Sequence, residues 1–260
     1  MSPERKKPKI SIITVVYNGE EHIEECIRSV LDQTYDNIEY IIIDGGSTDG
    51  TLAIAARYTD RIDKIVSEPD EGIYDAMNKG IGHATGDIVG FIHSDDYYST
   101  PRAIEMIADR FISTLADCVY AEMEYIRRTA GQKKVIRYWK ALPFRTGIMK
   151  TGWFPATPTF FARRRHYINY GGFNTELNIS ADFELILRFC DIIGLRAAFV
   201  PKVIIHMRYG GESNRNIGNI WEGVKQCRRA FLMNDIYISP LFLIKSVYFR
   251  FTQLFVRSHS

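Results

Sequence analysis

The first hundred residues alternate between short apolar runs and longer stretches that carry apolar residues on one helical face. The apolar runs are rich in β-branched residues and are bounded by polar turns, as is typical of buried strands. The predicted strands are Lys9–Val16, Ile38–Ile43, Asp63–Val66 and Asp87–Ile92. The predicted helices are 23–31, 53–57 and Ile73–Ile81. This alternation predicts an α/β fold with a Rossmann-like, doubly wound and mostly parallel sheet.

The second half of the chain is less regular, but it shows the same two patterns. The predicted helices are Ala103–Phe111, Asp182–Ile193 and a helical segment from Ile220 onward. The predicted strands are Val119–Tyr125, Ala197–Met207 and, with a connecting loop, Arg127–Lys140. Glycine and proline predict loops over Gly152–Pro158 and Gly210–Asn214.

The C-terminal segment 236–260 has the pattern of a basic amphipathic helix. Its apolar arc comprises Leu241, Leu243, Ile244, Val247, Phe251, Leu254 and Phe255, and the opposite side carries Lys245, Ser246, Arg250, Gln253 and Arg257. Such a helix lies in a membrane interface, packs on its own domain or contacts a second subunit. We favour peripheral membrane contact, and a dimer stays an open alternative.

Composition and charge exclude several classes of protein. The chain has 260 residues and a net charge of +2, which argues against nucleic acid as a partner. Its four cysteines have neither zinc-site nor disulfide spacing, so we expect a reducing cytoplasm. We expect no secretory signal, and no stretch reaches the roughly 18 consecutive apolar residues of a membrane span.

The tripeptide Ser94-Asp95-Asp96 follows the fourth predicted strand directly. In an open α/β sheet, ligands bind beyond the carboxyl ends of the strands. Adjacent carboxylates supply the oxygen ligands that suit Mg²⁺ or Mn²⁺, and these cations in turn suit phosphates. The alternative is a solvated turn, because Asp is common in turns.

The exit of the first strand carries polar side chains rather than a glycine-rich loop. Gly19 is the only glycine there, so the G-x-G-x-x-G pattern of dinucleotide-binding folds is missing. Thr14, Tyr17, Asn18 and Glu20 offer hydroxyl, ring, amide and carboxylate groups for a base and a ribose. The alternative is an ordinary strand-to-helix turn.

Asp44 and Gly45 end the second predicted strand. A carboxylate there can accept a hydrogen bond from the imide of a base such as uracil, and glycine permits close approach of the backbone. The alternative for Asp44 is an Asx turn. We favour a ligand contact, because Asp44 and Asp95 are predicted to lie on the same edge of the sheet.

Asp75, Asn78 and Lys79 fall one helical turn apart in the segment Gly72–Gly80. An amide and an ammonium in this arrangement can hold a ribose hydroxyl or a phosphate. Alternatively, Asp75 and Lys79 form an ordinary i,i+4 ion pair.

Taken in order, these segments resemble the family 2 glycosyltransferases, whose catalytic domain has the GT-A fold. The matching segments are Ser11–Glu20, Asp44–Gly50, Gly72–Gly80, Phe91–Asp96, Pro158–Phe161, Tyr170–Asn174, Ala181–Arg188 and Met207–Asn214. The resemblance covers residues 9–215. It implies a nucleotide-sugar donor, with a UDP-sugar favoured, a divalent cation (Mn²⁺ or Mg²⁺) and inversion at the anomeric carbon.

The resemblance also implies a role for several acids. Asp44 would hold the base, Asp95 would contact the ribose or the metal shell, and Asp96 would bind the metal directly. Asp182 occupies the position of the catalytic base, and His206 that of a late metal ligand in some GT-A enzymes.

Asp182 also has a physical case of its own. It opens a predicted helix, where the dipole favours a carboxylate, and a carboxylate can take the proton of an attacking hydroxyl. The alternative is a simple first-turn charge, and Glu184 is the second candidate for the base. Where relatives often carry a histidine, this chain reads Ala156-Thr157-Pro158. His93 is predicted to be a packed strand residue rather than a ligand.

We expect three parts: a nucleotide-sugar-binding half (1–100), an acceptor-binding half (101–219) and a helical extension (220–260). The predicted acceptor is a glycan or a lipid-linked saccharide of surface-polysaccharide assembly, reached from the cytoplasm or the inner face of the membrane. A non-processive enzyme is favoured. The rival hypotheses are a sugar-nucleotide nucleotidyltransferase and a nucleotide-binding scaffold that has lost catalysis.

Overall fold

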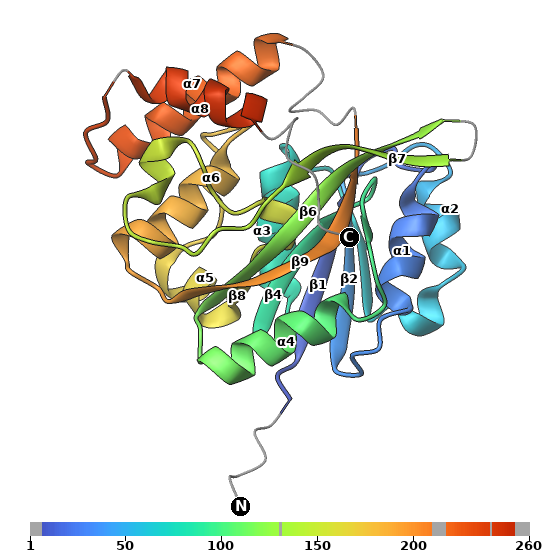
Figure 1. The fold of residues 1–260 in the computed structure, drawn as a ribbon. Helices are drawn as coiled ribbons and strands as arrows, with labels where there is room; N and C mark the ends of the chain where they lie inside the picture. The colour runs from blue at the N-terminus through green and yellow to red at the C-terminus, as the bar shows by residue number, and fades with distance from the viewer. Residues whose placement is uncertain (1–6, 130–131, 210–216, 240, 253–260) are drawn as a thin grey trace, which may run out of the picture.

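A computed structural model describes residues 7–129, 132–209, 217–239 and 241–252 (Figure 1). The strands are β1 (Ile10–Val16), β2 (Ile38–Asp44), β3 (Lys64–Ser67), β4 (Ile88–His93), β5 (Tyr97–Tyr98), β6 (Cys118–Thr129), β7 (Gln132–Trp139), β8 (Phe161–Arg163) and β9 (Ala197–Arg208). The helices are α1 (Ile23–Leu31), α2 (Thr51–Ala56), α3 (Ile73–His83), α4 (Ala103–Thr114), α5 (Arg164–Tyr170), α6 (Ala181–Ile186), α7 (Ile217–Met233) and α8 (Leu241–Thr252). The predicted Gly210–Asn214 loop lies outside the described residues.

One mixed sheet runs through both halves of the chain, in the order β3-β2-β1-β4-β8-β6-β9-β5, with β7 paired to β6. Strands β1 to β4 are parallel, as their alternation with helices predicts. Strand β8 then reverses the direction, and β6 runs parallel to β9. The first four strands therefore present their carboxyl ends at one edge.

The period-two alternation of β1 divides the core between the two faces of the sheet. Ile13 and Val15 pack on the face covered by α3, α5, α6 and α7, whereas Ile10 and Ile12 pack with α1 and α4. The same division is visible in Figure 1, where α1 and α2 lie far from α6 and α7. Helices on both faces explain why the β1, β2 and β4 sequences are almost continuously apolar.

Two features of the second half differ from the sequence prediction. The short strand β8 and helix α5 that follows it lie in a region where no element is predicted. The segment predicted as one helix from Asp182 is α6 followed by a π-helical stretch, Leu187–Ile192. The predicted strand-and-loop segment Arg127–Lys140 is the β6–β7 hairpin.

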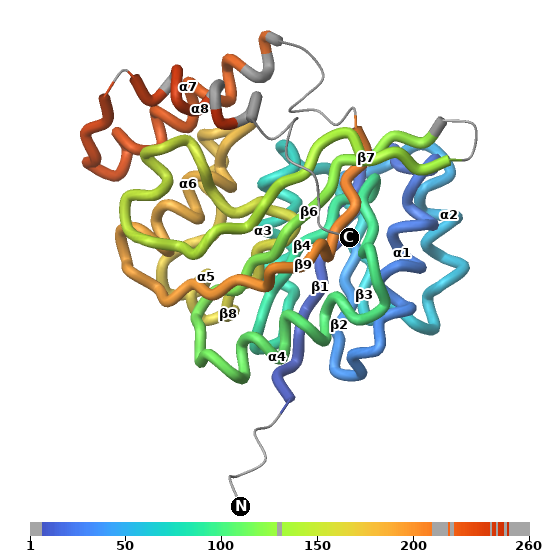
Figure 2. The backbone as a smooth tube through the Cα atoms, in the orientation of Figure 1, coloured from blue at the N-terminus to red at the C-terminus, as the bar shows by residue number. Residues whose placement is uncertain are grey.

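The C-terminal helices α7 and α8 lie beside α6 at one end of the molecule (Figure 2). Their contact with the domain is aromatic: the Phe231 ring lies 5.4 Å from Phe183 and 5.3 Å from Phe242. In the described part of the chain, no helix combines the length and hydropathy needed to cross a membrane.

Candidate active site

The carboxyl ends of β2 and β4 flank the end of β1. In the register of the sheet, Val16 of β1 lies beside Asp44 of β2, and Val15 lies beside His93 of β4. Asp95 and Asp96 follow His93 directly. As predicted, Asp44 and the Asp95-Asp96 pair therefore lie on the same edge of the sheet.

The Asp44 carboxylate is fully buried, and among the described residues only one of its oxygens is hydrogen-bonded. Its Oδ2 accepts hydrogen bonds from the N–H groups of Gly46 and Ser47 and from the Ser67 hydroxyl, at 3.2, 3.0 and 2.6 Å. Its Oδ1 is buried without a hydrogen-bond partner among the described residues. Asp44 Oδ2 therefore forms the Asx-type turn, while Oδ1 remains an unpaired acceptor. Oδ1 suits a donor N–H of a ligand.

The prediction that Thr14 contacts a ligand is wrong. Thr14 lies on the α1 face of β1, is fully buried and hydrogen-bonds to the Tyr40 hydroxyl at 3.0 Å. Asn18 and Glu20 hold the β2–α2 loop instead, because their side-chain oxygens accept from the N–H groups of Thr48 and Gly50 at 2.9 and 2.7 Å. Tyr17 is 65% exposed at the end of β1, so its ring is accessible to a ligand.

The predicted ligand-binding group on α3 is used inside the protein. Asp75 and Lys79 form the i,i+4 ion pair at 3.1 Å, which confirms the alternative interpretation. The Asn78 side chain donates a hydrogen bond to the carbonyl of Phe173 at 2.9 Å and accepts one from the N–H of Phe173 at 2.8 Å. These contacts lie within the protein, and a ligand contact by Asp75, Asn78 or Lys79 stays a prediction. At Gly45, a β-carbon would lie 2.3 Å from the Asp70 carboxylate, so the close approach there is to a side chain of the same chain.

The Asp95-Asp96 pair fits a divalent cation. Asp96 is buried, and neither of its carboxylate oxygens has a hydrogen-bond partner among the described residues. Burial raises the pKa of Asp96 well above its ordinary value, and the neighbouring charge of Asp95 adds to the rise. An unpaired carboxylate in such a place is costly unless a cation compensates it. Asp96, with Asp95 beside it, could therefore hold Mn²⁺ or Mg²⁺ through oxygen ligands.

His206 is not grouped with these carboxylates. It lies on β9, where its Nε2 is 2.7 Å from the Lys133 ammonium and 3.3 Å from Glu124 Oε2. Within the described residues, no three His, Cys, Asp or Glu side chains are placed to share a metal ion. The prediction that His206 is a metal ligand is not supported, since its ring contacts Lys133 and Glu124 instead.

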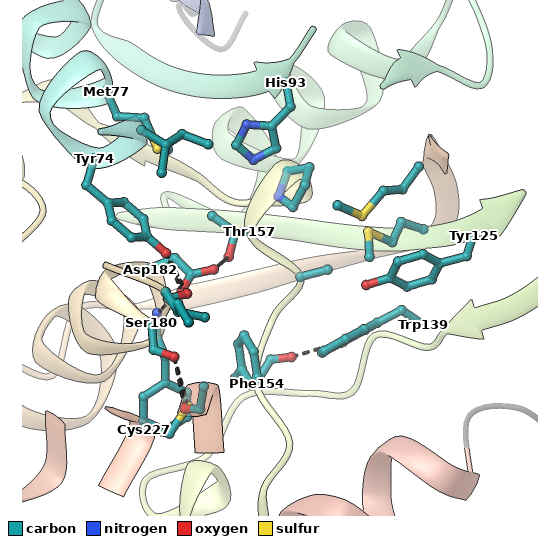
Figure 3. A pocket seen from close by; sticks show the side chains of 18 of the residues that line it. Tyr74, Met77, His93, Tyr125, Trp139, Phe154, Thr157, Ser180, Asp182 and Cys227 are labelled. Carbon is teal, nitrogen blue, oxygen red and sulfur yellow. Dashed lines mark hydrogen bonds between the residues drawn. The ribbon is translucent and has the colours of Figure 1, made fainter. Parts of the chain in front are cut away.

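Asp182 lines a pocket of about 180 Å³ between α3, α6 and the β6–β7 hairpin (Figure 3). The Thr157 hydroxyl donates a hydrogen bond to Asp182 Oδ2 at 2.5 Å. The Tyr74 hydroxyl lies 3.3 Å from Oδ1 and donates to the carbonyl of Ile179 at 2.8 Å. Asp182 thus stands at the start of α6, held by residues from two other segments.

His93 is a strand residue, as predicted, at the last position of β4, and it also lines the same pocket as Asp182. Its Nδ1 is buried without a hydrogen-bond partner among the described residues. Burial lowers the pKa of His93, while the charges of Asp95 and Asp182 act in the opposite direction. His93 therefore shares the pocket with Asp182 and is followed directly in the sequence by Ser94 and the carboxylate pair.

Glu184, the second candidate for a catalytic base, serves the fold. It is buried and forms a two-pronged ion pair with Arg188, whose Nε and Nη2 lie 3.0 Å from its two oxygens. Arg188 also donates to the carbonyls of 170–172. Glu184 is thus committed to this network, which leaves Asp182 as the acid in the pocket.

Comparison with known proteins identifies the family. The family described as glycosyl transferase family 2 matches residues 11–171, which is more than half of the chain. This chain belongs to glycosyltransferase family 2. It is a glycosyltransferase that depends on a nucleotide sugar, as the sequence predicts.

This family 2 enzyme has relatives in several bacteria. It is 32% identical over 200 residues to an uncharacterized glycosyltransferase of Mycobacterium tuberculosis, covering 73% of this chain and 72% of the relative. It is 42% identical over 99 residues to the putative teichuronic acid biosynthesis glycosyltransferase TuaG of Bacillus subtilis, covering 37% of this chain and 39% of TuaG.

Solved structures confirm the GT-A fold of the family 2 enzyme. The S. aureus TarS 1–349 structure in complex with UDP-GlcNAc superimposes with a TM-score of 0.67 at 18% identity, over 94% of this chain and 73% of that one. The mannosyltransferase PcManGT of Pyrobaculum calidifontis, in complex with GDP-Man and Mn²⁺, gives 0.66 at 19% identity, over 94% and 70%.

Across the pocket from Asp182, the wall is apolar and aromatic. Its rings are Tyr125, Trp139 and Phe154 (Figure 3), and the pocket is also lined by Met123, Met207 and Arg137, whose guanidinium lies over the Tyr125 and Trp139 rings. The Trp139 indole donates to the carbonyl of Phe154 at 3.1 Å, which fixes the ring. Flat aromatic rings beside a carboxylate suit an acceptor with an apolar ring face next to its hydroxyl.

Sequence reasoning missed Thr157, Tyr74 and His93. For Thr157 a signal existed, since it lies in the segment where relatives often carry a histidine. For His93 the signal was its place at the last position of β4, next to Ser94-Asp95-Asp96. Tyr74 gave no such signal, because its hydroxyl reaches Asp182 only through the tertiary contact between α3 and α6.

Proposed function

We propose that this enzyme transfers a single hexose-type sugar, with inversion, from a nucleoside diphosphate sugar to a hydroxyl of a glycan or lipid-linked saccharide. The observation that carries the proposal is that Asp182 and His93 line one pocket, and that Ser94-Asp95-Asp96 follows His93 directly at the end of β4. A donor bound near Asp44, Asp95 and Asp96 would place its anomeric carbon between the two carboxylate sites.

Asp182 is the proposed general base. The acceptor hydroxyl attacks the anomeric carbon and loses its proton to Asp182, while the bond to the diphosphate oxygen breaks on the opposite face. Thr157 donates to Oδ2 and so orients the carboxylate. A divalent cation held by Asp95 and Asp96 would neutralise the charge that develops on the diphosphate.

The donor and the pathway are inferred from chemistry and from relatives. The free Oδ1 of Asp44 suits the imide N–H of uracil, so we favour a UDP-sugar. TarS is known in complex with UDP-GlcNAc, whereas PcManGT is known with GDP-Man and Mn²⁺. TuaG is named for teichuronic acid biosynthesis, which supports a place in surface-polysaccharide assembly.

A panel of nucleotide sugars tests the donor assignment. We expect UDP-sugars to raise the melting temperature in the presence of Mn²⁺ or Mg²⁺, and to do so much less with EDTA, because a ligand that binds the folded state stabilises it by mass action. Turnover is then followed by release of nucleoside diphosphate. Release of pyrophosphate would indicate a nucleotidyltransferase instead, and stabilisation by GDP-sugars alone would contradict the uracil assignment.

The outer surface of α7 and α8 supports peripheral membrane contact. Phe242 and Ser246 are buried against the domain, so one face of α8 packs on the protein itself. The exposed large apolar residues of α7, α8 and the segment between them include Leu232, Met233, Tyr237, Leu241 and Ile244. Segment 236–260 contains no acidic residue but has Lys245, Arg250 and Arg257. Apolar and basic groups together suit an anionic lipid surface, and we propose a location at the inner face of the membrane.

Flotation with vesicles measures this contact. Because Phe242 is part of the core, deletion of α8 would disturb the fold, so we choose the surface variant L232S/Y237S/I244S. We expect the parent chain to float with phosphatidylglycerol vesicles, and the variant to lose most of this binding. The control is Ile168→Ser, which alters an exposed apolar residue on α5. Unchanged flotation of the triple variant would exclude the proposal, and a dimer dispersed by the same substitutions would indicate a second subunit.

A further inference from the structure

Two arginines converge beside the carboxylate pair from strands of the second half of the chain. Arg128 extends from β6 and Arg208 from β9, and these strands are parallel neighbours. Both guanidinium groups form ion pairs with Glu25 of α1. Two cations and one carboxylate leave a formal charge of +1 in this cluster. The cluster therefore keeps an excess of positive charge.

The Tyr97 ring supports both guanidinium groups. The ring centroid lies 5.5 Å from the Arg128 guanidinium carbon and 5.6 Å from that of Arg208. Only 17% of the Arg208 side chain is exposed, and its Nε is buried without a hydrogen-bond partner among the described residues. A buried guanidinium N–H without an acceptor is unusual and indicates a missing anionic partner.

The cluster borders the proposed metal site. Tyr97 follows Asp96 directly in the sequence. Arg208 is close enough to Asp96 for its charge to act against the rise in the pKa of that carboxyl caused by burial. The Asp96 carboxylate and the Arg208 guanidinium thus lie near one another, and both Asp96 oxygens and the Arg208 Nε are without a hydrogen-bond partner among the described residues.

We propose that Arg208, assisted by Arg128, binds the diphosphate of the donor and of the nucleoside diphosphate product. The inference rests on the proposed function and adds a diphosphate-binding residue to it. A guanidinium can donate two parallel hydrogen bonds to phosphate oxygens, which an ammonium cannot. A cation on Asp96 together with a diphosphate on Arg208 would satisfy both unpaired groups at once.

Glu25 is a positioning residue in this arrangement. It occupies one edge of each guanidinium and does not itself contact a phosphate. With Tyr97, it holds two flexible side chains in place before a ligand arrives. Binding normally costs the entropy of ordering long side chains. Here the two arginines are already ordered in the folded chain, so this cost is smaller.

The test compares the affinities for UDP and uridine in the presence of Mn²⁺. We expect Arg208→Ala to weaken UDP binding by about 10- to 100-fold, as for loss of charge-assisted hydrogen bonds. Uridine lacks phosphates, so its affinity is expected to stay unchanged. Arg208→Lys should lie between the parent and the alanine variant. Arg127→Ala is the control, because Arg127 is an arginine of the neighbouring strand β6 whose guanidinium lies over the Tyr209 ring.

The outcomes separate this inference from the proposed function. If the parent chain binds neither UDP nor uridine with Mn²⁺, the donor assignment fails. If it binds UDP and Arg208→Ala binds it equally well, the diphosphate role of Arg208 is wrong. Glu25→Gln keeps both arginines and should weaken UDP binding less than Arg208→Ala. Circular dichroism establishes that each variant is folded. If Arg208→Ala does not fold, Arg208→Lys takes its place in the comparison of UDP and uridine affinities.

Discussion

Asp182→Asn is expected to reduce sugar transfer by about 10²- to 10⁴-fold while nucleotide-sugar binding is retained. Asparagine keeps the shape of the side chain and can still accept from Thr157, but it cannot take a proton from the acceptor. The measurements are kcat for transfer and the donor Kd in the same preparation. Normal turnover of this variant would require a different base.

Substitutions at Thr157 show whether the carboxylate must be oriented. Thr157→Val removes the hydroxyl that donates to Asp182 Oδ2, whereas Thr157→Ser keeps it. We expect kcat to fall in the valine variant and to be restored in the serine variant, with little change in the donor Kd. An equal loss in both variants would indicate a packing effect rather than an effect on Asp182.

Asp96→Asn is expected to abolish the metal-dependent part of nucleotide binding. The buried carboxylate has no partner among the described residues, and asparagine lacks the charge that a divalent cation needs. At a nucleotide concentration of about 100 times Kd, the parent gains about 2.7 kcal/mol of stability, and the variant should lose this gain. Asp75→Asn is the control, because Asp75 is paired with Lys79 elsewhere. Undiminished metal-dependent stabilisation of Asp96→Asn would exclude the metal role.

In the absence of metal, the stability of Asp96→Asn relative to the parent is expected to depend on pH. Burial, and then the charge of Asp95, raise the pKa of Asp96 in the folded chain above its ordinary value of 3.8. The folded state therefore holds this proton more tightly, and the resulting stability is lost as the pH rises above the unfolded pKa. Metal-free Asp96→Asn should thus gain in stability relative to the parent as the pH increases. A constant difference between pH 4 and 8 would contradict the shift.

Most of the fold could be predicted from local patterns. The β-branched runs predict β1 and β2 within a residue or two, because both faces of these strands are covered and most of their positions are apolar. The strand β8 could not be predicted, since three residues carry no period. Its partners β4 and β6 come from distant parts of the chain.

Only part of the site could be predicted in the same way. Asp44 and Asp96 follow apolar strands, where a carboxylate has no role in the core, and the structure buries each with at least one unpaired oxygen. Thr14 is predicted to contact a ligand from its place on the first strand, Asn78 from helical spacing and His206 from the family resemblance. Their hydroxyl, amide and imidazole groups found partners on other elements, at Tyr40, Phe173 and Lys133.

The sequence by itself determined the family, the alternation of strands and helices and the edge at which acids collect, because strand ends and apolar periods are properties of neighbouring residues. Only the tertiary structure decided which polar groups remain unpaired. Hydrogen-bond partners such as Thr157 for Asp182 come from segments far apart in the chain. Whether a polar side chain is paired, as Asp182 is with Thr157, or left without a partner, as Asp96 is among the described residues, is settled by packing rather than by position in the sequence.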